Sequence, residues 1–254
     1  MLTWPEGCPV GMLTGHRDLV MATAFRPDGA ELVTVGADRQ VLLHAVPAAP
    51  AAPPRILSGH TGPVLAAAYS PDGALLVTAG GDASIRVWGA DARLVRVLNF
   101  HTAGVQCVAF RPPLPGREVS PYCATGGEDR TARVWQPGLG RMVRILREAS
   151  GPVLSVAFTR DGAELLTAAA DGKVRRYDGD SDELLGTWQA HPGWVGCLAV
   201  SPDGKRLATG AADGRVRLWD LPSGTPAVSP FEKSVWLPPP FRVAFGEWPP
   251  ATGG

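Results

Sequence analysis

The side chains best suited to chemistry in this sequence are a histidine, a threonine and an aspartate that recur at a fixed spacing. His60 is followed by Thr78 eighteen positions later and by Asp82 twenty-two positions later. By residue type, a histidine between a hydroxyl and a carboxylate is the arrangement of a hydrolase triad, in which the imidazole takes a proton from the nucleophile. The same residues could instead form a buried hydrogen-bond network, because their donors and acceptors are complementary.

The repetition of this set decides between the two interpretations. A tryptophan accompanies each complete set, and the three complete sets are His60, Thr78, Asp82 and Trp88; His101, Thr125, Asp129 and Trp135; and His191, Thr209, Asp213 and Trp219. At the same offsets the first copy has His44 in place of the tryptophan, and the fourth has Ala149 for the histidine and Tyr177 for the tryptophan. A catalytic site is needed once, whereas a stabilising network is needed in every structural unit. We therefore expect a structural role for these residues and no catalytic residue.

Short apolar runs between turn residues must position these side chains. Residues 64–69, 75–79, 84–88 and 94–98 each have the character of a strand, and the first run ends at Ser-Pro-Asp-Gly, residues 70–73. Proline sets the backbone of such a turn, aspartate bonds its own backbone, and glycine accepts the left-handed exit. Short strands with this punctuation are typical of all-β proteins. The period, in the low forties, predicts a repeat architecture.

Several motifs in these repeats resemble those of the WD40 family. They include Leu-Ser-Gly-His at 57–60, Tyr-Ser-Pro-Asp-Gly at 69–73, Ile-Arg-Val-Trp at 85–88 and Val-Arg-Leu-Trp-Asp at 216–220, and only the last contains the Trp-Asp dipeptide. The resemblance covers about residues 9–230 and implies an all-β fold, a β-propeller in which each repeat supplies one four-stranded antiparallel blade. It also implies that the histidine, threonine, aspartate and tryptophan of one repeat are joined by hydrogen bonds within one blade.

The repeats define the expected domain organisation. We predict one WD40-type propeller domain over residues 1–254, with repeats at roughly 13–46, 57–90, 98–137, 146–179 and 188–221. Partial strands at 1–12 and 225–246 would add a composite or incomplete sixth blade. The alternative is that the chain is a truncated piece of a longer propeller, and the sequence leaves both alternatives open. An unclosed ring would expose strand edges and favour self-association.

Charge and cysteine content narrow the classes of partner. The 24 basic and 24 acidic residues give a net charge of +0, so no overall positive field favours nucleic-acid binding. Four arginines each follow a turn aspartate by four positions: Arg86, Arg133, Arg175 and Arg217. Their side chains could pack along the blade with the guanidinium groups at solvent or a carboxylate. Alternatively, they could form a basic strip that binds phosphate. The four cysteines lack C-x-x-C spacing, so we expect no metal site and no cofactor, and the cysteines suit a reducing compartment.

The remaining expectations concern location and function. The first residues do not resemble a signal peptide and no apolar run approaches a membrane span, so we expect a cytoplasmic protein with no membrane contact. The resemblance implies a non-catalytic scaffold or sensor module that binds a protein or peptide on a propeller face, alone or within a larger signalling protein or complex. The alternatives are a propeller-framed, hydrolase-like enzyme and a nucleic-acid-binding propeller.

In the WD40 family the histidine loops and aspartate turns face the wide mouth of the channel, so the resemblance implies five candidate contacts for a partner: Arg17, Asp18, Glu128, Arg130 and Trp194. The tryptophan stands where other repeats have leucine, proline or glycine. A lone large aromatic side chain at such a position could anchor a partner. It could equally pack against the neighbouring blade.

Overall fold

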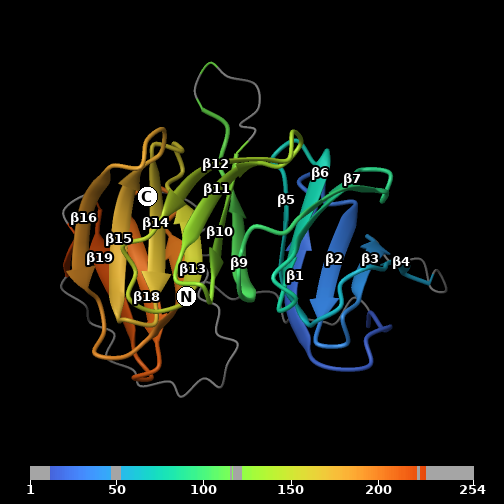
Figure 1. Ribbon diagram of the computed structural model, residues 1–254, viewed down its shortest axis with the longest axis horizontal. Helices are drawn as coiled ribbons and strands as arrows, with labels where there is room; N and C mark the ends of the chain where they lie inside the picture. The colour runs from blue at the N-terminus through green and yellow to red at the C-terminus, as the bar shows by residue number, and fades with distance from the viewer. Residues whose placement is uncertain (1–11, 47–52, 115, 117–121, 222–223, 227–254) are drawn as a thin grey trace, which may run out of the picture.

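The computed structural model describes residues 12–46, 53–114, 116, 122–221 and 224–226 (Figure 1). These residues form five four-stranded antiparallel sheets and contain no helix, which confirms the all-β, blade-based fold class. The first sheet contains β1 (Val20–Phe25), β2 (Glu31–Gly36), β3 (Val41–Ala45) and β4 (Arg55–Leu57). The second contains β5 (Val64–Tyr69), β6 (Leu75–Gly80), β7 (Ile85–Gly89) and β8 (Leu94–Leu98).

The other three sheets repeat this order of strands. The third contains β9 (Val105–Phe110), β10 (Cys123–Gly127), β11 (Ala132–Gln136) and β12 (Arg141–Leu146). The fourth contains β13 (Val153–Phe158), β14 (Glu164–Ala169), β15 (Lys173–Asp178) and β16 (Leu184–Gln189). The fifth contains β17 (Val195–Val200), β18 (Arg206–Ala211), β19 (Val216–Asp220) and β20 (Thr225–Pro226).

The strands form where the apolar runs of the second repeat predict them. The predicted runs 64–69 and 94–98 coincide with β5 and β8, and the other two lie within one residue of β6 and β7. The turn after β5 has the expected chemistry. The Gly73 amide donates to the Ser70 carbonyl at 2.8 Å, and the Ala74 amide donates to Asp72 Oδ1 at 3.0 Å. Gly73 adopts a φ of 69°, which glycine accepts without steric cost.

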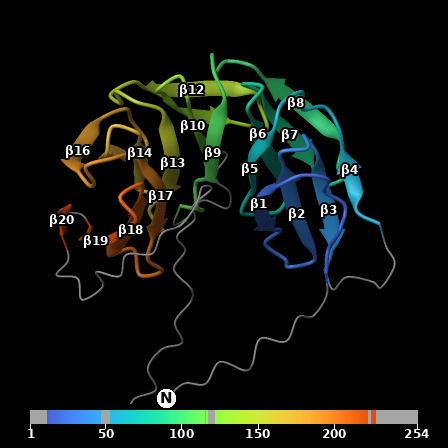
Figure 2. The same ribbon diagram turned by 90° about the horizontal axis from the view of Figure 1, so that it is seen from below.

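The sheets follow one another along an arc (Figure 2). The hydrophobic core lies between them. The innermost strands of neighbouring sheets pack together: β1 with β5, β5 with β9, β9 with β13 and β13 with β17. Between the second and third sheets, for example, Val77 and Val87 pack in one buried cluster with Val105 and Trp135. Burying a valine side chain contributes roughly 1.5–3 kcal/mol, so each junction between sheets is a substantial source of stability.

The first sheet has one face that no described sheet covers. The valine that begins the innermost strand is 0–1% exposed in four sheets, at Val64, Val105, Val153 and Val195. Its equivalent in the first sheet, Val20, is 48% exposed. The difference arises because each of the four buried valines packs between its own sheet and the preceding one.

The two ends of the sheets differ in what they carry. In Figure 1 the strands run vertically, and the hairpins that join second and third strands lie at the lower end. The turns between first and second strands lie at the upper end. We call these the hairpin end and the turn end.

The predicted partial strands fall almost entirely outside the described residues. The exception is β20, which pairs with β19 as the outer strand of the fifth sheet. The expected sixth blade lies outside the described part of the chain. No helix in that part is both long and apolar enough to cross a membrane.

Candidate functional site

In the second sheet the predicted network is a connected set of hydrogen bonds. His60 Nδ1 lies 3.0 Å from Asp82 Oδ2, and His60 Nε2 lies 2.9 Å from Thr78 Oγ1. The Trp88 indole donates to the same Thr78 oxygen at 3.0 Å. The histidine comes from the loop before β5, the threonine from β6, the aspartate from the β6–β7 hairpin and the tryptophan from β7. We call such a set a clasp, because it ties a loop, a hairpin and two strands of one sheet together.

The third and fifth sheets contain the other two predicted sets. His101 lies 2.9 Å from both Asp129 Oδ2 and Thr125 Oγ1, and Trp135 donates to Thr125 at 2.8 Å. In the fifth sheet the corresponding distances are 3.0, 2.8 and 2.9 Å, and the residues are His191, Thr209, Asp213 and Trp219. The structure therefore brings together the members of each predicted set within a single sheet.

The first sheet has a clasp in which a second histidine replaces the tryptophan. His16 bonds Asp38 at 3.0 Å and Thr34 at 2.8 Å, and Thr34 Oγ1 lies 3.0 Å from His44 Nε2. Because the threonine hydroxyl donates to His16, His44 must carry its proton on Nε2. The signal in the sequence is that His44 stands at the tryptophan offset.

The fourth sheet lacks a clasp because Ala149 stands in the histidine position. Its turn aspartate, Asp171, instead pairs with Arg175 at 2.5 Å and accepts the Ser150 amide at 3.0 Å. Tyr177, in the tryptophan position, donates its hydroxyl to Glu148 at 2.8 Å. The Ser150 amide thus ties the loop to the hairpin in this sheet, and the ion pair ties the hairpin to β15.

Electrostatics fix the protons in the clasps. Burial favours a raised pKa at Asp82, but hydrogen bonds from Ser84 and from the amides of Thr61 and Ser84 outweigh burial and lower its pKa to about 2. Asp82 is therefore an ionised acceptor, and His60 must donate to it from Nδ1. Burial lowers the pKa of His60 more than the nearby carboxylate raises it, so the neutral imidazole accepts from the threonine at Nε2.

In each clasp the hydroxyl, the imidazole and the carboxylate that a hydrolase would need are already hydrogen-bonded within the clasp. Thr78, Thr125 and Thr209 are each 0% exposed, and each hydroxyl oxygen already accepts an indole N–H. A substrate could not reach a hydroxyl at this depth. Within the described residues, no three histidine, cysteine or acidic side chains are close enough to hold a metal ion.

The clasps also organise the loops at the hairpin end. The clasp aspartate accepts the amide of the residue after the histidine in the first three sheets, at Arg17 (2.8 Å), Thr61 (2.8 Å) and Thr102 (3.2 Å). The hairpin backbone donates to the same carboxylates, as the Gln40 amide does to Asp38 at 3.1 Å. Each of these carboxylates therefore joins a loop to a hairpin at this end.

The five candidate contact residues lie in three different sheets at this end. Arg17 and Asp18 are exposed in the loop before β1, and Glu128 and Arg130 are exposed in the β10–β11 hairpin. Gln106 donates to Glu128 at 2.8 Å, and Arg130 has a φ of 64°, where glycine is favoured. Trp194 is half-buried before β17. The structure places the candidates as two adjacent pairs and a separate tryptophan, in the first, third and fifth sheets.

The row of arginines is largely neutralised. Arg133 bonds Asp129 at 3.1 Å, and Arg217 bonds Asp213 at 2.8 Å, as Arg175 does Asp171. Arg86 instead donates to the Gly59 carbonyl at 2.6 Å. Of the two predicted alternatives, the geometry is that of arginine heads paired with carboxylates.

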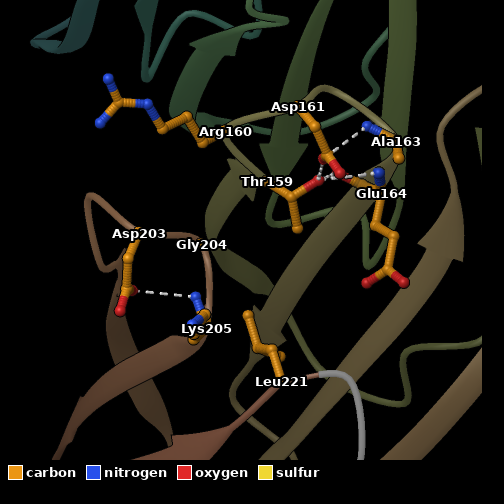
Figure 3. Close-up of a pocket in the computed structure, with 9 residues that line it drawn as sticks. All are labelled: Thr159, Arg160, Asp161, Ala163, Glu164, Asp203, Gly204, Lys205 and Leu221. Atoms are coloured by element: carbon orange, nitrogen blue, oxygen red, sulfur yellow. Dashed lines mark hydrogen bonds between the residues drawn. The ribbon is translucent and has the colours of Figure 1, made fainter.

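A hollow of about 530 Å³ opens at the turn end, between the fourth and fifth sheets (Figure 3). Its lining comes from the β13–β14 turn, the β17–β18 turn and the end of β19: Thr159, Arg160, Asp161, Ala163, Glu164, Asp203, Gly204, Lys205 and Leu221. This volume lies within the range of small-ligand sites. Reasoning from the sequence did not identify this hollow.

Comparisons with known proteins agree with the repeat structure. The model of a family described as "WD domain, G-beta repeat" matches residues 7–44, 52–89, 92–136, 140–178 and 182–220. An uncharacterized WD repeat-containing protein of Synechocystis is 35% identical over 79 residues, which are 31% of this chain and 21% of that protein. Nuclear distribution protein nudF of Aspergillus niger is 28% identical over 129 residues, 44% of this chain and 29% of the relative. Actin-interacting protein 1 of Drosophila melanogaster is 34% identical over 104 residues, 40% of this chain and 16% of the relative. The matches span less than a third of the length of each relative.

Proposed function

The chain belongs to the WD40 repeat family, and from this premise we propose that it is a non-catalytic module that binds a protein or peptide partner at its hairpin end. WD40 proteins are generally interaction scaffolds, and one relative is named for its interaction with actin, which is itself a protein. That name supports a protein partner here in preference to a nucleic acid. The paired arginines support the same preference, because they offer little free positive charge for phosphate.

The observation that carries this proposal is the hydrogen bonding of the loops and hairpins at the hairpin end. Each clasp aspartate binds its histidine and its own hairpin, and in the first three sheets also the next loop amide. Ordering loops on binding costs free energy, so loops that are already ordered retain more of the interaction energy as affinity. Charged side chains such as Arg17 and Glu128 project from this ordered surface.

Arg130 gives a second reason to look at this end. Its φ of 64° is unfavourable for a residue with a side chain, and so is the φ of 69° at Arg39, the equivalent residue of the first sheet. The second sheet has Ala83 there with a φ of 62°, and the fourth and fifth sheets have Gly172 and Gly214. Strained backbone tends to persist where it serves a function. We infer that the two arginines serve this face through their exposed side chains.

The test begins with a selection that assumes no partner. Peptides selected from a random phage-displayed library on the immobilised full chain should protect the loops at 16–19, 102–104 and 192–194 and the hairpin at 127–130 from hydrogen exchange. Peptides that instead map to the outer strands would refute the proposed site.

Variants then separate binding from folding. Arg130→Gly should weaken a selected peptide roughly tenfold, the loss of one favourable contact of about 1.4 kcal/mol, while raising the melting temperature. Trp194→Ala should weaken it without lowering the melting temperature if the indole is an anchor. Arg93→Ala, at an exposed arginine in the β7–β8 turn, is the control and should change neither quantity. Equal losses in all three variants would mean that the contacts are non-specific.

The proposed location is the cytoplasm. Cys123 is a buried free thiol, and burial raises its pKa, so it is a poor nucleophile for disulfide exchange. A reduced, inert thiol supports a reducing compartment.

A further inference from the structure

An arginine fills the junction between neighbouring sheets at two places on the turn end. Arg111 follows β9 and is 1% exposed. Its Nε donates to the carbonyl of Gly162, the turn glycine of the next sheet, at 2.7 Å, and its Nη1 donates to Asp180 at 2.7 Å. A methyl group added at Gly162 would lie 3.3 Å from Arg111 Nε. The guanidinium is therefore seated directly against the neighbouring turn.

The junction between the first and second sheets has an arginine at the same position, but it is partly exposed and bonds to its own turn. Arg26 holds the position of Arg111, and Gly73 holds that of Gly162. A methyl group added at Gly73 would lie 3.2 Å from Arg26 Cγ. The Arg26 guanidinium pairs with Asp28 of its own turn at 2.8 Å. In both junctions an arginine side chain lies between two turns and bonds to a turn acceptor.

The junction between the fourth and fifth sheets has no arginine at this position, and neither has the junction between the second and third sheets, where the residue is Ser70. Between the fourth and fifth sheets the residue is Thr159, whose hydroxyl donates to Asp161 Oδ1 at 2.7 Å and accepts the Glu164 amide at 3.0 Å. The threonine is therefore turned toward its own turn. A methyl group added at Gly204, the equivalent of Gly73 and Gly162, would meet no described atom within 4 Å. The hollow of about 530 Å³ lies beside this shorter side chain (Figure 3).

The charged groups that line the hollow are the carboxylates Asp161, Asp203 and Glu164 and the cations Arg160 and Lys205. Asp161 and Asp203 belong to the two facing turns, and hydrogen bonds from Thr159 and Ser201 respectively, with turn amides, hold the pKa of each carboxyl below its usual value. Both carboxyls are therefore ionised at neutral pH. Each uses Oδ1 for its turn bonds. Both oxygens of Glu164 are held by Arg176, at 2.8 and 2.7 Å.

Of the two cations of the lining, Arg160 bonds to the facing turn, as Arg111 does at its own junction, and Lys205 is exposed. Arg160 donates to the Pro202 carbonyl at 2.7 Å, and Figure 3 shows its side chain extending away from Leu221. Lys205 is exposed and lies beside Asp203. Ala163 and Leu221 supply apolar surface on which the methylene groups of a long side chain could pack.

We propose that this hollow binds an arginine side chain of a polypeptide partner, in the place that Arg26 and Arg111 occupy at their own junctions. The guanidinium would lie between Asp161 and Asp203, with its stem against Leu221. This site is at the opposite end of the sheets from the proposed partner face, and it does not depend on that face.

The first experiment titrates the ¹⁵N-labelled full chain with N-acetyl-arginine N-methylamide. The amides of residues 159–164 and 203–205 should shift, with a Kd of about 1 mM for one isolated side chain. The citrulline analogue, which has the same shape without the charge, should not bind. No shift at these residues up to about 10 mM would overturn the proposal, since that is ten times the expected Kd. Tighter binding of free arginine than of the capped probe would assign the hollow to an amino acid and overturn the polypeptide assignment.

Three variants test the geometry and the sign of the charge. Thr159→Arg should fill the hollow as Arg111 does, abolishing binding of the probe without lowering the melting temperature. Lys205→Ala removes a like charge at an exposed position and should tighten binding about two- to fivefold, because close like charges repel. Weaker binding in Lys205→Ala would indicate an anion site and refute the proposal.

A matched pair of carboxylates completes the test. Asp161→Asn keeps an oxygen for the turn and should weaken the probe about fivefold or more, because a charge-assisted hydrogen bond is lost. Asp72→Asn makes the same change in the equivalent turn of the second sheet, where Asp72 accepts the Ala74 amide in the same way. It should leave the affinity unchanged, and equal losses in the two variants would contradict the assignment.

Discussion

Replacing Thr78 by valine removes the hydroxyl at the centre of the second clasp and keeps the branched shape of the side chain. In the native protein this oxygen lies 2.9 Å from His60 Nε2 and 3.0 Å from Trp88 Nε1. Thr78 is 0% exposed, so water cannot take the place of the hydroxyl. The variant therefore leaves an imidazole acceptor and an indole donor buried without partners.

The expected cost follows from these two losses. An unsatisfied buried polar group costs about 1–3 kcal/mol, and we take about 3 kcal/mol for the pair because the groups can relax slightly. The added methyl group returns about 0.8 kcal/mol of hydrophobic burial. We expect Thr78→Val to lower the free energy of unfolding by about 2 kcal/mol, which for a chain of this size is about 4–8 °C in melting temperature.

Urea unfolding at pH 7.5 measures this change, with an unchanged m-value as the sign that the unfolded state is the same. Thr167→Val is the matched control, because the fourth sheet has Ala149 in place of the histidine and Tyr177 keeps its bond to Glu148. The control should cost about 1 kcal/mol or less, the loss of one ordinary hydrogen bond. A Thr78→Val protein within about 0.5 kcal/mol of wild type, the usual range of neutral surface changes, would refute the reasoning. So would equal costs in the two variants.

Three further predictions concern the backbone, the protons and the junctions. Ala83 has a φ of 62° in the β6–β7 hairpin, so Ala83→Gly should stabilise the protein by about 0.5–1 kcal/mol. The control Ala79→Gly, in the regular strand β6, should destabilise it. The melting temperatures of the two variants test this difference. Burial lowers the pKa of His60 and of three other clasp histidines, so the unfolded state binds protons first as the pH falls. The free energy of unfolding should be level above about pH 7.5 and should fall as the pH drops below about 6.5. Urea midpoints that rise on acidification would contradict this. Arg111→Ala should lower the free energy of unfolding by about 2–3 kcal/mol, because it removes charge-assisted hydrogen bonds between the third and fourth sheets. Added N-acetyl-arginine N-methylamide should restore part of the lost melting temperature. An unchanged melting temperature in the variant would mean that the junction does not depend on this side chain.

The repeating parts of this fold could be predicted from the sequence because each is a local property of one repeat. Strands such as β5 and β8 follow from apolar runs that end at glycine and aspartate turns. The residues of one clasp fall at constant offsets, so repetition alone predicts that His60 and Asp82 act together. The same offsets place His44 where a tryptophan stands elsewhere, but spacing does not show that an imidazole N–H can reach the threonine as an indole does.

The parts that could not be predicted depend on contacts between repeats. Arg111 bonds to Gly162 and Asp180 across a junction, and nothing in its own repeat indicates these partners. The hollow lies beside Thr159, a short side chain at a position where two other junctions have an arginine. Only the packed sheets show that the position after the innermost strand faces the next turn.

The uncovered face at Val20 has a consequence for how the protein opens. In a linear array each unit is stabilised by its own bonds and by its nearest neighbours. The sheet of β9 to β12 has neighbours on both sides, whereas among the described sheets the one that begins with Val20 has a single neighbour, β5 and its partners. Amide hydrogens of β1 should therefore exchange through small, frequent openings, and those of β10 only through cooperative unfolding of most of the array. A partner or a further sheet that covered Val20 would slow the exchange of β1 without touching its hydrogen bonds.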